Sequence, residues 1–164
     1  MDSETARLSK TSIVALSAPA LPMFAMMMPL AVFLPAYYAD GLGLGMAAVG
    51  SLFALGRMFD VVTDPFAGVI MDRLQQTIQR KTWLAIGAVP IAVAVANLFF
   101  ATGEVSAIWL FSWLLCLYLG WTLMSVGLYS WAAETSTDYH ERSRVMASLQ
   151  AANSIGSVLV LPGS

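Results

Sequence analysis

Five apolar runs separated by short polar clusters constrain this sequence more than any other feature. A hydrocarbon core about 30 Å thick is crossed by ~20 consecutive apolar residues in a helix. Four of the runs have that length, and the fifth has no polar loop after it, as expected for a truncated chain. The predicted spans are roughly 13–38, 46–71, 82–101, 106–132 and 143–161. The sequence therefore predicts an all-α membrane protein with about five transmembrane helices in residues 1–164.

The composition supports this class and excludes others. Hydrophobic residues make up 59% of the chain and charged residues only 11%, which leaves too little polar surface for a soluble domain. The formal charge is -2 and no basic stripe interleaves with aromatic residues, so no nucleic-acid partner is expected. Neither a nucleophile–base pair nor a metal-ligand set appears, so the chain is not expected to be an enzyme or to hold a cofactor.

The distribution of positive charge predicts the orientation in the membrane. Lys and Arg near the ends of spans stay in the cytoplasm during insertion. The two opposite loops carry only Asp40 and Glu104 as charged residues. The basic residues that fall on one side are Arg7, Lys10, Arg73, Arg80, Lys81, Arg142 and Arg144. We therefore expect a multi-pass protein of the cell membrane with a cytoplasmic N-terminus.

Charged residues inside the second span form the most informative motif. Arg57, Asp60 and Asp64 interrupt an apolar run, and each ionised side chain at a helix centre costs roughly 2.5–3.5 kcal/mol. At about 100° per residue, Arg57 and Asp64 lie within about 60° of Asp60, with Thr63 at the edge of the same face. Carboxylate and hydroxyl oxygens suit Na+, and a carboxylic acid can instead carry H+.

A structural interpretation of the same motif stays open. Arg57 can neutralise one aspartate as a buried ion pair that only fixes helix packing. The second carboxylate would then still need a partner or an aqueous cavity.

The loop after this span resembles a signature of the major facilitator superfamily. Gly68 stands four residues before Asp72-Arg73, and the basic pair Arg80-Lys81 precedes the third span. Asp72 at a helix end near several cations suits an ion pair that breaks when helices rock. Ordinary cytoplasmic placement of positive charge explains Arg80 and Lys81 equally well.

Three pieces together resemble one branch of that superfamily, the glycoside-pentoside-hexuronide:cation symporters. They are Tyr37-Tyr38-Ala-Asp40, Arg57-x-x-Asp60-x-x-x-Asp64-Pro65 and Asp138-Tyr-His-Glu-Arg-Ser-Arg144. The resemblance implies twelve helices in two halves, with substrate and cation bound between them. This chain would be most of the N-terminal half and would pair with a missing C-terminal half.

The resemblance also implies roles for individual residues. The expected ligands for a coupling Na+ or H+ are Asp60, Asp64, Thr63 and Thr122. The candidate substrate-binding residues are Arg57, Phe24, Ser125 and Tyr129. Phe24 and Ser125 stand where galactoside carriers of the family have aspartates, so a different sugar or glycoside-like solute is expected. The candidate gating residues of the cytoplasmic loops are Asp72, Arg73, Arg80, Lys81, Asp138, Arg142 and Arg144.

Two other functions fit the same pattern. An uncoupled facilitator or exporter of the same fold would move its solute without a sodium gradient. A membrane receptor or assembly subunit would use the polar face of the second span to bind a partner helix, and would bind without transporting.

Overall fold

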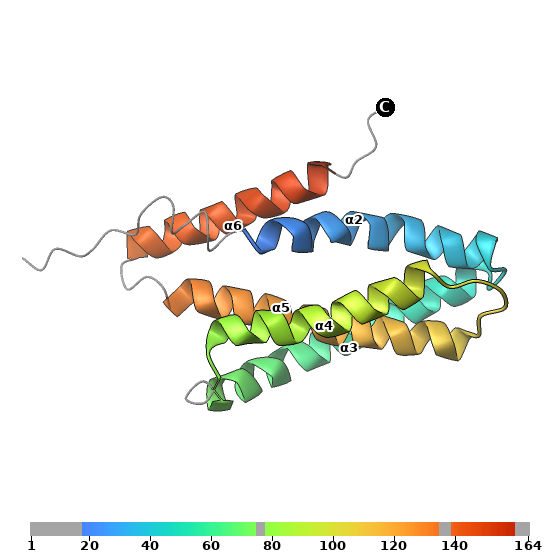
Figure 1. Cartoon of the computed structure of the whole chain (residues 1–164), viewed down its shortest axis with the longest axis horizontal. Coiled ribbons are helices and arrows are strands. Elements are labelled where there is room, and N and C mark those ends of the chain that lie inside the picture. The colour runs from blue at the N-terminus through green and yellow to red at the C-terminus, as the bar shows by residue number, and fades with distance from the viewer. Residues whose placement is uncertain (1–17, 75–77, 135–138, 160–164) are drawn as a thin grey trace, which may run out of the picture. The chain divides into compact units, whose positions relative to one another are not determined.

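A computed structural model describes residues 18–74, 78–134 and 139–159, and the regular elements in these ranges are all helical (Figure 1). Their order is α2 (Ala20–Ala36), a π-helical turn η1 (Tyr37–Gly41) that continues it, α3 (Met46–Leu74), α4 (Arg80–Phe99), α5 (Ala107–Glu134) and α6 (Tyr139–Leu159). The all-α fold predicted from the apolar runs is confirmed.

Four of these helices are long and apolar enough to cross a membrane, over residues 20–41, 46–74, 82–99 and 107–132. They correspond to the first four predicted spans. The fifth predicted span, 143–161, overlaps α6, which is not in this set because polar and charged residues occupy its first turns. Residues 160 and 161 lie outside the described ranges, so a fifth crossing stays a prediction.

The helix ends differ from the predicted ones by a few residues. The first helix extends to Gly41 because i to i+5 hydrogen bonds continue it, as from Leu42 N–H to the Tyr37 carbonyl at 3.1 Å. Helix α3 continues to Leu74, so Asp72 and Arg73 belong to its last turns and not to a loop. Helix α6 begins at Tyr139, which places His140 in a helix where the sequence pattern suggested a polar loop.

The chain divides into two compact units, residues 1–31 with 130–164, and residues 32–129. In the first unit, α6 packs closely against the start of α2. A Cβ atom on Gly156 would lie 2.8 Å from the carbonyl oxygen of Leu21 and 3.0 Å from the amide nitrogen of Ala25. The absence of a side chain at Gly156 therefore lets the two backbones approach each other.

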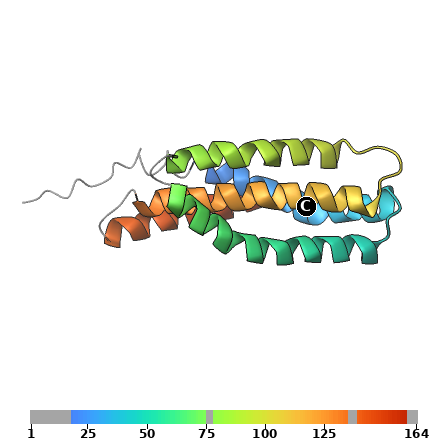
Figure 2. The same ribbon diagram turned by 90° about the horizontal axis from the view of Figure 1, so that it is seen from below.

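In the second unit, α5 lies between α3 and α4, as Figure 2 shows. Its contact with α4 is made through glycines. A Cβ atom on Gly87 would lie 2.7 Å from the Gly120 carbonyl oxygen and 2.8 Å from the Met124 amide nitrogen. Small residues allow such close approach of helices in membranes, where van der Waals packing replaces the hydrophobic effect between helices.

Two tyrosines of η1 attach this turn to the end of α4. The Tyr38 hydroxyl donates to the Leu98 carbonyl at 2.8 Å, and the Tyr37 hydroxyl donates to the Ala101 carbonyl at 2.7 Å. Leu98 lies in the last turn of α4, where backbone acceptors have no partner within the helix, and Ala101 lies in the turn that follows α4. The centre of the Tyr38 ring also lies 6.4 Å from the centre of the Trp109 ring of α5, with the two planes tilted by 32°. The Tyr37-Tyr38 pair of the sequence motif thus joins three elements of this unit.

The glycine contact between α4 and α5 generates a stability prediction. In Gly87→Ala the added methyl group meets backbone atoms that cannot rotate away, so the free energy of unfolding should fall by about 1–3 kcal/mol. Thermal unfolding of the protein in detergent measures this as a lower Tm. The control is Gly50→Ala in α3, where a Cβ atom has nothing within 4 Å. An equal Tm for the two variants would contradict the close contact.

Candidate functional site

Two carboxylates of α3 meet one hydroxyl of α5 in the second unit. The Oγ1 atom of Thr122 lies 2.8 Å from Oδ1 of Asp60 and 2.8 Å from Oδ1 of Asp64. Asp60 and Thr122 are buried, with exposed fractions of 7% and 1%, whereas Asp64 is exposed. We refer to Asp60, Asp64 and Thr122 as the carboxylate cluster. It forms because residues four apart lie on the same face of α3.

The count of hydrogens limits the charge states of the carboxylate cluster. A threonine hydroxyl has one hydrogen, so Thr122 can donate to only one of the two carboxylates. The second contact is a hydrogen bond only if that carboxylic acid is protonated and donates to the hydroxyl. With both aspartates ionised, one pair of acceptor oxygens would face each other without a hydrogen between them. The geometry therefore suits one extra proton, or a cation bound among these oxygens.

Arg57 supplies part of the compensating charge. Its Nη1 lies 3.2 Å from Oδ2 of Asp60, while its side chain is 56% exposed. Arg57, Asp60 and Asp64 together carry one net negative charge when all three are ionised. The addition of one monovalent cation would make this group neutral, which reduces the cost of holding it inside a membrane.

Pro65 follows the second carboxylate and lies inside α3. Proline has no backbone N–H, so it removes one hydrogen bond from the helix and favours a bend. Figure 2 shows that α3 is not straight along its course.

In the described structure, the hydroxyl of Thr63, the remaining predicted cation ligand, bonds to a backbone carbonyl and not to a carboxylate. Thr63 directs its hydroxyl to its own helix, where it donates to the Asp60 carbonyl at 3.1 Å. Its role as a cation ligand stays a prediction that requires this side chain to rotate.

The candidate substrate-binding residues occupy several places. Ser125 lies one turn after Thr122 and donates its hydroxyl to the Thr122 carbonyl at 3.2 Å. Tyr129 is exposed on the same helix. Phe24 is partly buried in the first unit, and Arg57 pairs with Asp60. Their contacts with a solute stay predictions.

The predicted gating residues are only partly described. Asp72 and Arg73 are exposed near the end of α3, and Arg144 is exposed in α6. The backbones of Arg80, Lys81 and Arg142 are helical, but their side chains lie outside the described structure, as does all of Asp138.

Tyr118 is a neighbour of the cluster that the sequence motifs did not indicate. It lies one turn before Thr122 on α5, and the Arg57 Cζ atom is 5.9 Å from the centre of its ring. Tyrosine in an apolar helix is common, so the residue type gave no signal. The spacing of four residues from Thr122 would have placed it on the same face.

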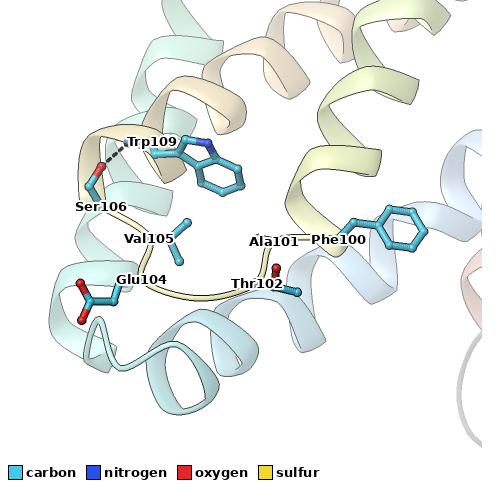
Figure 3. A pocket seen from close by; sticks show the side chains of 7 residues that line it. All are labelled: Phe100, Ala101, Thr102, Glu104, Val105, Ser106 and Trp109. Atoms are coloured by element: carbon cyan, nitrogen blue, oxygen red, sulfur yellow. Dashed lines mark hydrogen bonds between the residues drawn. The ribbon is translucent and has the colours of Figure 1, made fainter.

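A second candidate is a cavity of about 460 Å³ at the turn between α4 and α5, lined by Phe100, Ala101, Thr102, Glu104, Val105, Ser106 and Trp109 (Figure 3). Its polar groups do not converge. The Glu104 carboxylate points away from the Trp109 indole, and the Ser106 hydroxyl accepts a hydrogen bond from the Trp109 backbone at 3.2 Å. The carboxylate cluster is therefore the better candidate site.

The atoms of the carboxylate cluster that could bind a cation are oxygens, which are hard ligands. Within the described ranges, no group of three or more His, Cys, Asp and Glu side chains is placed to hold a metal ion. Two carboxylates and a hydroxyl match the preferences of a proton or an alkali cation better than those of a transition metal.

Comparison with known proteins gives a family and several relatives. The sequence pattern of the family described as MFS/sugar transport protein matches residues 15–162. The "Putative glycoside/cation symporter YagG" of Escherichia coli strain K12 is 40% identical over 77 residues, which cover 46% of this chain and 16% of that protein. The "Uncharacterized symporter YnaJ" of Bacillus subtilis strain 168 is 38% identical over 71 residues, or 43% of this chain and 15% of that protein.

A third relative is the "Glucuronide carrier protein homolog" of Escherichia coli strain K12, 36% identical over 64 residues, which cover 38% of this chain and 14% of that protein. The matched segments thus span a small part of each relative's length. No solved structure matches the chain.

The shared hydroxyl of Thr122 generates a prediction about stability. Thr122→Val keeps the side-chain shape but removes the hydroxyl, so the buried Asp60 loses a hydrogen-bond partner, and the free energy of unfolding should fall by about 1–3 kcal/mol. Thr122→Ser retains the hydroxyl and should lose less. Thermal unfolding of both variants in detergent tests this, and a serine variant no more stable than the valine variant would argue against the hydrogen bonds.

Proposed function

Because the chain belongs to the MFS/sugar transport protein family, we propose that it is part of a secondary transporter that couples a cation, Na+ or H+, to movement of a sugar or glycoside-like solute. The observation that carries this proposal is the Thr122 hydroxyl lying 2.8 Å from both aspartates. One hydroxyl hydrogen makes a full hydrogen bond to only one of two ionised carboxylates, so an added proton or cation would stabilise the cluster. We propose Asp60, Asp64 and Thr122 as the cation site.

The cation would act by linkage and not by covalent chemistry. A net negative charge at the centre of a helix pair is costly inside a membrane, and cation binding would remove this cost. If the cation raises affinity for the solute, the solute must raise affinity for the cation by the same factor. The protein would then cross between inward and outward states mainly when both are bound, which makes transport a symport.

The class of solute follows from the relatives and not from the site. One relative is named as a putative glycoside/cation symporter and another as a glucuronide carrier homolog. The candidate contacts on this chain are Arg57, Phe24, Ser125 and Tyr129, of which Arg57 and Tyr129 are exposed. We propose that a C-terminal half, the rest of a twelve-helix protein, completes the solute site.

The predicted orientation belongs to the same proposal. The chain is a multi-pass membrane protein with candidate spans at 20–41, 46–74, 82–99 and 107–132. With the N-terminus in the cytoplasm, Asp72 and Arg73 would lie at the cytoplasmic end of α3. There they would contribute to gating with Arg80, Lys81, Asp138, Arg142 and Arg144.

Uptake by the full-length protein in vesicles tests the proposal. We expect labelled glycosides, pentosides or hexuronides to accumulate when an inward Na+ or H+ gradient is imposed. Asp60→Asn and Asp64→Asn should each lower gradient-driven uptake by at least tenfold, because an amide cannot bind a proton or balance a cation. Glu104→Gln is the control, since it removes a carboxylate outside the cluster and should leave uptake unchanged.

The possible outcomes separate the alternatives. Uptake that ignores both the gradient and the two cluster variants would identify an uncoupled facilitator and overturn the cation site. Solute binding without uptake would favour a receptor role.

A further inference from the structure

Tyr118 of α5 packs between two consecutive residues of α3. One contact is with Arg57, whose Cζ lies 5.9 Å from the ring centre, within the range of a cation–π interaction. The other is with Gly56, where an added Cβ atom would lie 2.9 Å from Cδ2 of the ring and still closer to Cε2. The ring therefore reaches Arg57 only because residue 56 has no side chain. Tyr118 is itself buried, with 8% exposed, so its position is well constrained.

Arg57 has contacts with both helices of this pair. Its side chain is 56% exposed, and among the described residues its guanidinium contacts the Asp60 carboxylate in one ion pair and the Tyr118 ring. An exposed arginine with a single ion pair readily exchanges that pair for water. The ring lowers the freedom of the guanidinium and favours the arrangement paired with Asp60.

Each carboxylate oxygen of Asp60 contacts a different partner. Oδ2 contacts Arg57, while Oδ1 contacts the Thr122 hydroxyl. A cation that binds at Oδ1 thus meets a carboxylate already paired with a guanidinium. A fixed positive charge a few ångströms away repels the incoming cation and competes for the same carboxylate.

We propose that Tyr118 is a positioning residue that holds the Arg57 guanidinium on Asp60 and thereby lowers the affinity of the carboxylate cluster for its cation. This inference rests on the proposed cation site. A transporter gains from such a limit, because a cation held too tightly is not released on the far side of the membrane. Gly56 belongs to the same device, since it makes room for the ring.

The first test removes the ring. In Tyr118→Leu the guanidinium loses its aromatic partner, and the half-saturating cation concentration should fall by about two- to fivefold, the range for an exposed cation–π interaction. Tyr118→Phe keeps the ring and should restore the native value. The probes are Na+, added as NaCl with choline chloride as the control, and H+, supplied by lowering the pH. The readout is the midpoint of the thermal stabilisation of the full-length protein in detergent.

A second variant displaces the Tyr118 ring through a substitution in α3. Gly56→Ala adds a methyl group that displaces the ring, so it should lower the half-saturating concentration in the same direction as Tyr118→Leu. Gly50→Ala, on the same helix with open space at its Cβ position, is the matched control and should not shift it. This variant also keeps the proposal testable if Tyr118→Leu does not fold.

A double-mutant cycle separates positioning from simple packing. Arg57→Gln should also lower the half-saturating concentration, and Tyr118→Leu should add no further shift in that background, because Tyr118 acts through Arg57. Equal shifts with and without Arg57, or a loss of Tm with no change in the midpoint, would overturn the proposal.

Asp60→Asn distinguishes failure of the proposed cation site from failure of the role proposed for Tyr118. If it leaves cation binding unchanged, the proposed cation site fails and this inference falls with it. If it abolishes cation binding while Tyr118→Leu leaves the midpoint at the native value, only the role of Tyr118 fails.

Discussion

The contact of two aspartates with one threonine hydroxyl is the interaction on which the polar centre of this protein depends. The single hydrogen of the Thr122 hydroxyl can make a full hydrogen bond to only one of the two carboxylates, although both lie 2.8 Å from it. A soluble protein would solve this problem with water. Inside a bilayer each ionised side chain is costly, and in this structure Arg57 pairs with Asp60 while Asp64 is exposed. Under the proposed function, a proton or ion neutralises the remaining negative charge. Helix packing and chemistry are therefore linked at this point.

The fold could be predicted largely from the sequence, since hydropathy determines which segments can cross a bilayer. Four of the predicted spans correspond to apolar helices, and the family expected from the three sequence pieces together is confirmed by the match over residues 15–162. Helix ends were less predictable, because they depend on local hydrogen bonds. The π-helical turn at Tyr37–Gly41 is an example, since nothing in its composition distinguishes an i to i+5 bond from an ordinary helix end.

The site could be predicted only where its members share one helix. The spacing of Arg57, Asp60 and Asp64 predicted a common face, but the contact between α3 and α5 depends on tertiary packing. Thr122 was expected from family resemblance and not from spacing. Tyr118 and Gly56 were missed because each looks ordinary alone, and only the structure shows that the glycine makes room for the ring. Thr63 shows the opposite case, where a suitable side chain bonds to its own helix.

The tyrosines of η1 have a consequence for how this chain can change during evolution. Both hydroxyls are bonded to backbone carbonyl oxygens, at Leu98 and Ala101, and not to side chains. Every amino acid presents such an oxygen, so the two bonds themselves do not depend on which side chains occupy these positions. The dependence is one-sided, because replacement of either tyrosine by phenylalanine removes its bond at once. At Leu98 and Ala101 it is burial of the side chains in the core, and not the hydrogen bonds, that limits which residues fit.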